Sequence, residues 1–279
     1  MYDIHRINVG DADNERNAAF LAEVFSNQKL YTKEYIKWQY ADHPFGRIIG
    51  YNAILDNEIA AHFVLQPFPA IVNGKESRGL LAFNSATKKD HQGKGLFMML
   101  ANKTIAEVVA SGYEFITAVT NHNSVHAYTK RLGFQLVCQL PAKIGFGVVE
   151  SDKKHDDIMF EKFWNKELLD WRLANPLDNY SFIDTNDKGY YSKTHLPFVK
   201  AFLLKPRSMN PIKQRGFGWR PSTLFIGLDK TIKLQGLFFN IPERLKPSPL
   251  FLVYRDLLNG NNKLDKEKVK FNLIDFDAY

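Results

Sequence analysis

The sequence predicts an α/β protein with a mixed central sheet, followed by a second half that is rich in strands. Three observations support this fold class. Helix-like and strand-like periodicities alternate over roughly the first 140 residues. A loop punctuated by glycines connects one of these strands to an amphipathic helix. One segment of the first half recurs in the second half, where strand patterns then dominate.

The first half alternates between the two kinds of element. Helical patterns cover residues 13–25, a segment capped by Thr32 that ends near Pro44, residues 95–110, and a short stretch from Ser124 to Leu132. Strand patterns cover residues 4–9, 47–55, 58–65, 79–87, 115–120 and 134–139. Asp56-Asn57 joins two of these strands as a hairpin, and Asn73-Gly74 marks another tight turn.

A polar segment over residues 150–157 separates the halves and predicts two domains, 1–149 and 158–279. Residues 165–175 repeat the pattern of residues 32–42, with Lys, Glu, Trp and Ala in register, and a duplicated architecture follows. Strands are then expected over 180–184, from Tyr190, and over 199–204, 223–228, 237–241, 250–254 and 271–276.

Composition narrows the function classes. Hydrophobic residues make up 45% and charged residues 24%, which are the values of a globular protein. The net charge of +7 suits an anionic ligand, but Lys and Arg alternate with acidic residues, so nucleic-acid binding is not expected. No apolar run reaches the length of a membrane-spanning helix, and the first residues lack the apolar region of a signal peptide. The lone Cys138 reads as a buried hydrophobe, which leaves a cytoplasmic location as the default.

The segment from Ala82 to Phe97 carries the chemistry. A strand runs into a loop with Gly93 and Gly95, and the loop opens a helix whose first backbone N–H groups have no partner within the helix. Such a helix start attracts anions, and glycines let the backbone approach a ligand closely. Nearby Lys88, Lys89 and Lys94 add positive charge. The segment predicts a phosphate-binding turn, and an ordinary strand-to-helix turn is the alternative.

Gln92-Gly-Lys-Gly95 resembles the Gln/Arg-x-x-Gly-x-Gly/Ala signature of the GNAT superfamily of acetyltransferases, although Phe97 stands where the last small residue is usual. The resemblance covers about residues 1–140 and implies acetyl-CoA, or another acyl-CoA, as the cofactor. It implies contacts to this cofactor from Ala86, Thr87, Gln92, Gly93, Lys94, Gly95, Leu96 and Phe97, and from Asn121 and Asn123 further along the chain. The second half is then expected to be a degenerate GNAT-like unit without a cofactor loop.

Residues 115–134 resemble the fifth strand of that superfamily, the helix after it, and its closing Leu-Gly-Phe. Many members carry a tyrosine on this helix that protonates the leaving thiolate. The usual spacing falls on Thr129, whereas this sequence has Tyr128, so Tyr128 is the candidate acid and packing beside the cofactor is the alternative. Among His62, His91, His122 and His126, we select His122 as the candidate base because it directly follows the strand.

The resemblance implies an N-acyltransferase that moves an acyl group from acyl-CoA to a small-molecule amine, with an amino sugar of surface polysaccharide synthesis as one candidate acceptor. An aminoacyl-tRNA-dependent transferase of the peptidoglycan type and an inactive CoA-binding module stay open as alternatives. The histidines have no metal-ligand spacing, so no metal is expected.

Overall fold

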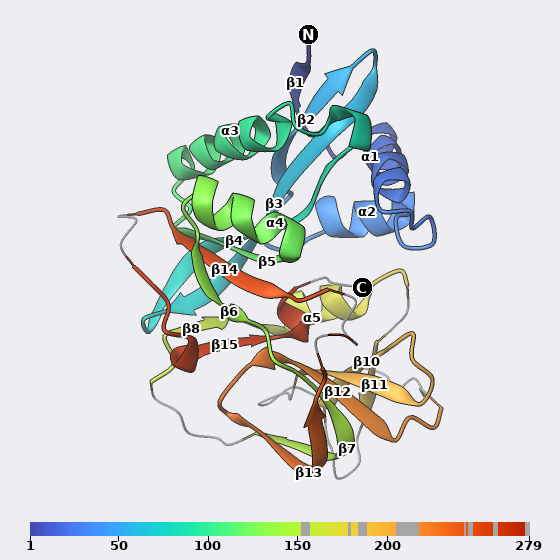
Figure 1. The fold of residues 1–279 in the computed structure, drawn as a ribbon, viewed down its shortest axis with the longest axis vertical. Helices are drawn as coiled ribbons and strands as arrows, with labels where there is room; N and C mark the ends of the chain where they lie inside the picture. The colour runs from blue at the N-terminus through green and yellow to red at the C-terminus, as the bar shows by residue number, and fades with distance from the viewer. Residues whose placement is uncertain are drawn as a thin grey trace.

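The computed structural model describes residues 1–151, 157–177, 180–183, 189–204, 218–242, 244, 248–258 and 262–276. Its two lobes are joined by one mixed sheet of 15 strands (Figure 1). The predicted α/β fold class, with a mixed sheet and a strand-rich second half, is confirmed.

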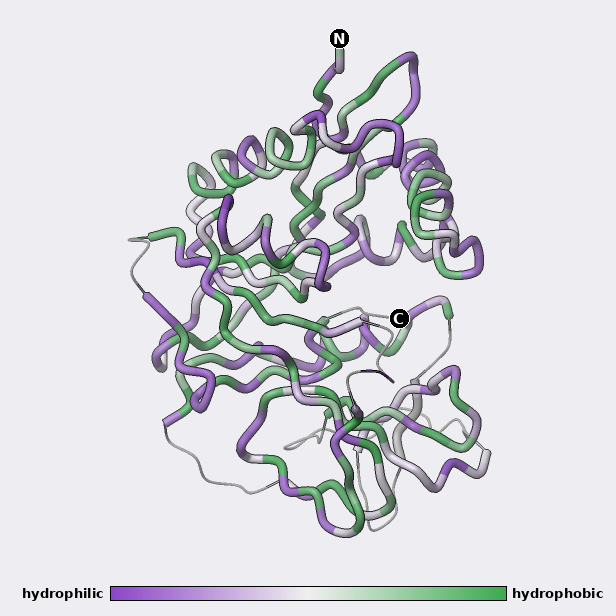
Figure 2. Tube along the Cα trace, viewed as in Figure 1, coloured by the Kyte–Doolittle hydropathy of each residue, from purple (hydrophilic) through white to green (hydrophobic). Residues whose placement is uncertain are grey.

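The first lobe contains six strands and four helices of the first half. The strands are β1 (Asp3–Arg6), β2 (Ile49–Leu55), β3 (Glu58–Val72), β4 (Lys75–Thr87), β5 (Phe115–Thr120) and β6 (Gln135–Gln139), and the helices are α1 (Asp11–Val24), α2 (Lys33–Tyr40), α3 (Leu96–Ala110) and α4 (His122–His126). Helices α1 and α2 bury one face of the sheet, and α3 and α4 bury the other. The strands are accordingly mostly hydrophobic, while hydrophobic and hydrophilic residues alternate along the helices (Figure 2).

The second lobe repeats the strand order of the first. It contains β9 (Tyr180–Ile183), β10 (Gly189–Lys193), β11 (Val199–Leu204), β12 (Ser222–Leu228) and β13 (Ile232–Asn240), preceded by α5 (Lys166–Leu173). In both lobes, three antiparallel strands are followed by a parallel neighbour, since β4 pairs with β5 and β11 pairs with β12 in the parallel sense. This shared order supports the duplicated architecture.

Each lobe takes one strand from the opposite part of the chain. Strand β14 (Phe251–Asp256), which follows β13, lies between β5 and β6 of the first lobe and is antiparallel to both. Strand β7 (Ala142–Ser151), which follows β6, lies between β12 and β13 of the second lobe. Figure 1 shows the exchange as a red strand among green ones and a green strand among orange ones.

Two further contacts join the lobes. Strands β8 (Phe160–Lys162) and β15 (Val269–Asn272) pair with each other and connect β3 to β12. Trp38 of α2 and Trp171 of α5, which occupy equivalent positions of the repeat, stack with ring centroids 4.6 Å apart. Each indole N–H donates to the other residue's carbonyl oxygen, at 2.8 and 3.0 Å. The repeated helices therefore face each other in nearly two-fold fashion.

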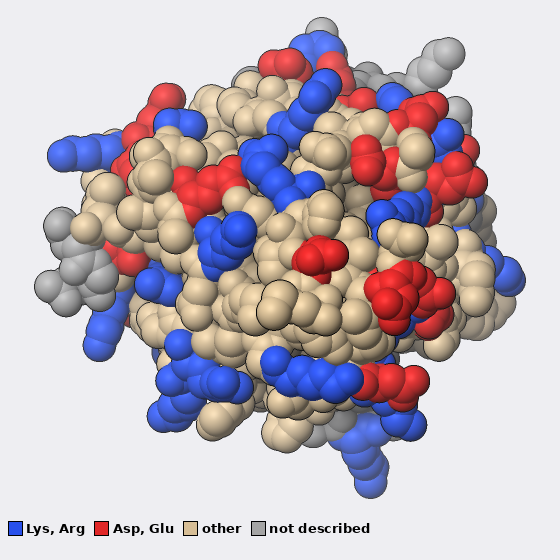
Figure 3. Space-filling model, turned by 90° about the horizontal axis from the view of Figure 1, so that it is seen from above, with Lys and Arg blue, Asp and Glu red and all other residues tan. Residues whose placement is uncertain are grey.

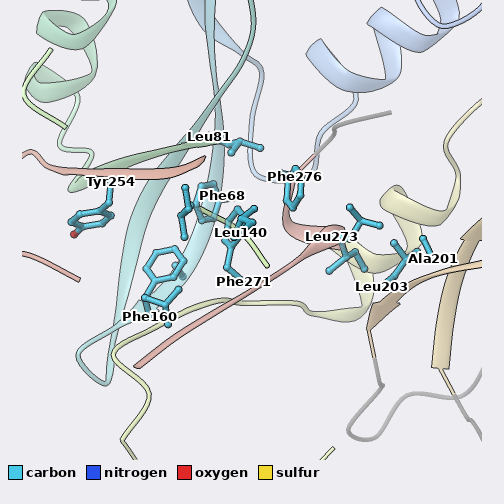
Figure 4. Packing of buried hydrophobic residues seen from close by; sticks show 14 of the residues in the cluster. Phe68, Leu81, Leu140, Phe160, Ala201, Leu203, Tyr254, Phe271, Leu273 and Phe276 are labelled. Atoms are coloured by element: carbon cyan, nitrogen blue, oxygen red, sulfur yellow. The ribbon is translucent and has the colours of Figure 1, made fainter. Parts of the chain in front are cut away.

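The largest hydrophobic cluster crosses the boundary between the lobes. Figure 4 shows Phe68 and Leu81 of the first half packed with Phe160, Phe271 and Phe276 of the second. The two predicted domains, residues 1–149 and 158–279, share this core. Strands β7 and β14 each pair with strands of the other predicted domain.

One strand was missed in the sequence, and two sequence predictions need correction. Residues 142–149 form most of β7, although their glycines gave no strand signal; a Cβ on Gly145 would lie 2.0 Å from the Leu237 carbonyl oxygen of the neighbouring strand, so glycine is required there. Helix α4 begins at His122 instead of Ser124 because Asn121 caps it. The expected strand at 271–276 ends at Asn272 and continues as a 3₁₀ turn over Leu273–Asp275. The predicted turn at 187–189 falls largely outside the described residues.

We expect Val253→Ala on β14 to lower the free energy of unfolding by about 2 kcal/mol, because the side chain is fully buried in the cluster beneath α3. Urea unfolding followed by tryptophan fluorescence measures this loss. Leu237→Ala is the matched control, since Leu237 on β13 is 66% exposed and its truncation should change stability by less than about 0.5 kcal/mol. Equal effects of the two substitutions would contradict the assignment of β14 to the first lobe's core.

Candidate active site

The loop between β4 and α3 has the geometry of an anion-binding turn. Gly93 and Gly95 adopt left-handed φ angles of 74° and 76°, and Gly95 forms the N-cap of α3. No side chain caps this helix. A Cβ placed on either glycine would meet no atom within 4 Å, so both face open space in the protein alone. The first turn of α3 therefore presents its backbone N–H groups and its positive dipole end to this space.

The polar side chains of the loop differ in their freedom. Gln92 donates from Nε2 to the Thr87 carbonyl oxygen at 3.2 Å, which ties the loop to the end of β4. Lys88 lies between Glu23 and Glu58, at 2.9 and 3.1 Å, so its charge is largely compensated. Lys94 is exposed, with its ammonium group 5.9 Å from the centre of the Tyr2 ring. Of the predicted lysines, Lys94 and the exposed Lys89 are the better placed to meet an anion.

Over the face shown in Figure 3, Lys and Arg are interspersed with Asp and Glu. This face therefore has no broad field of one sign, and attraction of an anion depends on the charges close to the loop.

Strands β4 and β5 diverge next to the loop. They pair only from Gly79 to Ala82 on β4, although β4 continues to Thr87. The divergence begins at a bulge in β4, where Asn84 has a left-handed φ of 49° and the register with β3 shifts. Ala86 is buried and Thr87 half-buried beyond this bulge. The end of β4 thus leads from the bulge directly into the glycine loop.

Tyr128 lies in a π-helical turn (Ala127–Arg131) that continues α4, and its side chain is 3% exposed. Burial raises the pKa of Tyr128 to about 12, and a hydrogen bond with Ser85 of the bulge partly offsets the rise. The Phe97 ring packs 5.7 Å from both the Tyr128 and the Phe63 rings. Leu96 is buried in the same cluster, so Leu96 offers only its backbone to a ligand.

The residues at the start of α4 are exposed. The Asn121 side chain accepts hydrogen bonds from the Asn123 and Ser124 backbone N–H groups, each at 3.0 Å, and so serves the helix cap. Asn123 and His122 are exposed on the first turn of the helix. The Asn-x-x-Ser spacing of this capping box was a signal available in the sequence.

The structure also reveals polar residues that sequence reasoning missed. Asn84 and Ser85 of the bulge were not among the predicted site residues, yet Ser85 contacts Tyr128. Their signal was a polar pair inside an otherwise apolar strand pattern. His62, one of four histidines considered, is fully buried, and burial lowers its pKa to about 3. His62 is therefore neutral near pH 7.

A cavity lies where the two halves meet. It is lined by Gln39, Gln66, Leu81, Phe83, Lys162, Trp171, Arg172, Ile274, Asp275 and Phe276. His43 packs edge-on against Trp171 at 4.4 Å; burial, together with the positive charges of Lys162 and Arg172, lowers the pKa of His43 to about 3. Phe83 in this lining directly precedes Asn84, which connects the cavity wall to the bulge of β4.

The chain resembles known acetyltransferases in both sequence and fold. The family profile described as Acetyltransferase (GNAT) family matches residues 11–134. No curated protein matches the chain. The solved structure of a conserved protein from Enterococcus faecalis, described as a probable N-acyltransferase, is similar with a TM-score of 0.56 and 10% identity over 92% of this chain and 73% of that one.

Two further solved structures share the fold over nearly the whole chain. Eis1 from Mycobacterium abscessus has a TM-score of 0.53 and 9% identity, covering 92% of this chain and 74% of its own. A GCN5-related N-acetyltransferase from Kribbella flavida has a TM-score of 0.54 and 9% identity, covering 90% and 71%. The acetyltransferase family profile thus covers residues 11–134, and the fold of nearly the whole chain is similar to the folds of these three solved structures.

Within the described part of the chain, no helix is long and apolar enough to cross a membrane. Likewise, no group of three or more His, Cys, Asp or Glu side chains among the described residues is arranged to hold a metal ion.

The two buried histidines predict acid sensitivity. In the unfolded chain His43 and His62 protonate near pH 6.5, but in the folded protein only near pH 3. Their contribution to stability is therefore complete above about pH 6.5 and is lost as the pH falls toward 3. Each histidine should add about 1.4 kcal/mol per pH unit to the slope of stability between pH 6 and 4.

Urea unfolding at pH 7, 6, 5 and 4 measures this slope. His43→Gln and His62→Gln should each reduce it, whatever their effect on stability at pH 7. Slopes that remain equal to that of the wild type in both variants would show that neither histidine is the group that senses pH.

Proposed function

We propose that this GNAT domain binds acyl-CoA at the loop of residues 92–97 and transfers the acyl group to the amine of a small molecule. The observation that carries the proposal is the uncapped N-terminus of α3 beside two left-handed glycines whose Cβ positions are open. A pyrophosphate fits such a turn, because backbone N–H groups and the helix dipole both favour an anion. Lys94 adds a charge that no carboxylate compensates within the contacts described.

The gap between β4 and β5 suits the remainder of the cofactor. A pantetheine arm that extends from the glycine loop along the end of β4 passes Thr87 and Ala86 and reaches the bulge. The thioester carbonyl would then meet backbone donors of this strand segment, which would stabilise the oxyanion of the tetrahedral intermediate. Asn121 and Asn123 stand on the β5 side of the same gap, at the start of α4.

The chemistry follows from this arrangement. The amine nitrogen attacks the thioester carbonyl carbon, a C–N bond forms, and the C–S bond breaks as the tetrahedral intermediate collapses. Tyr128 supplies a proton to the departing thiolate; with a pKa of about 12, its hydroxyl is fully protonated near pH 7. The proton lost by the amine passes to His122, the exposed histidine at the start of α4, or to water.

The acceptor is proposed from the resemblance of the sequence. An amino sugar of surface polysaccharide synthesis remains the proposed acceptor, with the second half forming a wall of its pocket. Helix α5 lies at the junction of the two halves, where Trp171 and Arg172 line a small cavity together with Phe83 of β4. We propose a cytoplasmic setting, since the single cysteine requires no oxidising compartment.

The glycine loop can be tested with Gly95→Val. The valine Cβ would occupy the space proposed for the pyrophosphate, so CoA affinity measured by calorimetry should fall at least 100-fold. Gly74→Val is the matched control, because Gly74 has a φ of 77° and equally open surroundings but lies in a hairpin turn. Both variants should lose about 1–2 kcal/mol of stability from left-handed strain. Wild-type CoA affinity in Gly95→Val would overturn the assignment.

The role of Tyr128 can be tested with Tyr128→Phe, which keeps the ring contacts with Phe97 and Phe134. We expect kcat with acetyl-CoA and an accepted amine to fall by about 10²–10⁴-fold, with CoA affinity nearly unchanged. An unchanged kcat would show that Tyr128 only packs beside the cofactor. Binding of CoA without turnover across a panel of amines would favour the inactive module, and absence of CoA binding would favour the aminoacyl-tRNA-dependent alternative.

A further inference from the structure

The bulge in β4 changes which residues face the proposed acyl site. Val64 of β3 pairs with Phe83, and His62 pairs with Ala86, so Phe63 alone stands opposite both Asn84 and Ser85. One extra residue is therefore present on β4. An extra residue of this kind reverses the face to which every later side chain points.

The packing on the two faces confirms the reversal. Ala82 belongs to the cluster under α3, and Phe83 to the cluster under α1 and α2. Regular alternation would point the Asn84 side chain toward α3. Its amide instead donates hydrogen bonds to residues of α2, so the side chain lies on the same side of the sheet as Phe83. Ser85 consequently faces Tyr128, and Ala86 packs with the α1 and α2 cluster.

Asn84 is held in this position by two acceptors on α2. Its Nδ2 donates to Gln39 Oε1 at 3.0 Å and to the Tyr40 hydroxyl oxygen at 3.2 Å. Asparagine tolerates a left-handed φ better than most residues, but the conformation persists only where its surroundings impose it. The two hydrogen bonds that Asn84 donates to α2, together with one that its Oδ1 accepts from the Tyr31 hydroxyl at 3.5 Å, hold the residue in this conformation.

Tyr40 is itself oriented by a buried chain of hydrogen bonds. Asn52 Nδ2 donates to Asn17 Oδ1 at 3.0 Å, which leaves Asn52 Oδ1 to accept from His62 Nδ1–H at 2.6 Å. This tautomer leaves His62 Nε2 to accept from the Tyr40 hydroxyl at 2.8 Å. The members of the chain are all at least nine-tenths buried, so each bond is protected from exchange with water.

We propose that Tyr40 and His62 are positioning residues for the acyl-transfer reaction, which hold Asn84 on the α2 side of β4 and thereby aim Ser85 at Tyr128. This inference rests on the proposed function. Neither residue reaches the reacting atoms. Their role is to determine which side of the sheet each side chain from Ser85 to Thr87 faces, in the segment along which the thioester is proposed to lie.

Removal of the Tyr40 hydroxyl breaks its hydrogen bonds with both Asn84 and His62. Asn84 loses one of its two acceptors, and the buried His62 Nε2 loses its donor. The extra residue of β4 can then shift, and Ser85 moves away from Tyr128. The glycine loop lies beyond the bulge and keeps its own geometry, so the pyrophosphate contacts are unaffected.

The test is Tyr40→Phe, assayed with acetyl-CoA and whichever amine of a panel the wild type acetylates fastest. We expect kcat to fall at least tenfold and KM for acetyl-CoA to stay within about twofold. Tyr254→Phe is the matched control: Tyr254 is also a buried tyrosine, but it packs with Phe115 and Phe160 in the other cluster. Its kcat should stay within about twofold of the wild type, which separates positioning from general loss of stability.

A crystal structure of Tyr40→Phe supplies the second measurement. We expect Asn84 to leave its left-handed conformation or Ser85 to turn from Tyr128. If the wild type turns over and Tyr40→Phe has the same kcat, this inference is wrong and the proposed function stands. The same conclusion follows if the variant structure keeps both the bulge and the contact between Ser85 and Tyr128. A wild type that consumes no acetyl-CoA with any amine overturns the proposed function and this inference together.

Discussion

The reciprocal exchange of β7 and β14 is the constraint on which the rest of the structure depends. Each strand is central in its lobe, with a hydrogen-bonded neighbour on either side, so neither lobe has a complete sheet without the other part of the chain. The same two parts of the chain also share a hydrophobic core and the stacked tryptophans of the repeated helices. The second lobe thus completes the sheet of the first lobe, to which the glycine loop belongs.

The proposed site combines two elements with different origins of rigidity. The glycine loop owes its shape to backbone conformations that only glycine adopts at low cost, so its geometry is local. The bulge of β4 owes its shape to side chains from α1, α2, β2 and β3, so its geometry is tertiary. Tyr128 lies where the two meet, against Phe97 from the loop side and Ser85 from the bulge side.

Sequence reasoning succeeded where a feature is encoded locally. The pair Gly93 and Gly95 before an amphipathic stretch predicted a loop that opens a helix, and α3 begins directly after Gly95. Thr32 was predicted to cap a helix, and its side chain accepts from the Tyr35 backbone N–H; Asn165, at the equivalent position of the repeat, accepts from the Leu168 backbone N–H in the same way. The strand pattern of residues 250–254 was also recognised, but a pattern of alternation does not specify which strand lies beside it.

The features that sequence reasoning missed depend on partners distant in sequence. Strand β7 was overlooked because Gly145 and Gly147 read as loop residues, whereas they are glycines because the backbone of β13 passes too close for a Cβ. The bulge was overlooked because Asn84 acquires its conformation from Tyr40 and Gln39 on another element. Predicted roles for His122, Asn121 and Asn123 likewise depend on a bound cofactor, and they remain predictions.

The strand exchange has a consequence for how the protein emerges from the ribosome. Thr120 of β5 bonds to Phe251 of β14, 131 residues further along the chain. At typical rates of synthesis, β5 and β6 must wait on the order of ten seconds, with unpaired edges, before the strand that belongs between them is made. For most of that time β7 is likewise without β12 and β13. Strand edges of the nascent chain therefore stay exposed for longer than in a fold whose neighbouring strands follow one another in sequence, and exposed edges of this kind favour aggregation before synthesis is complete.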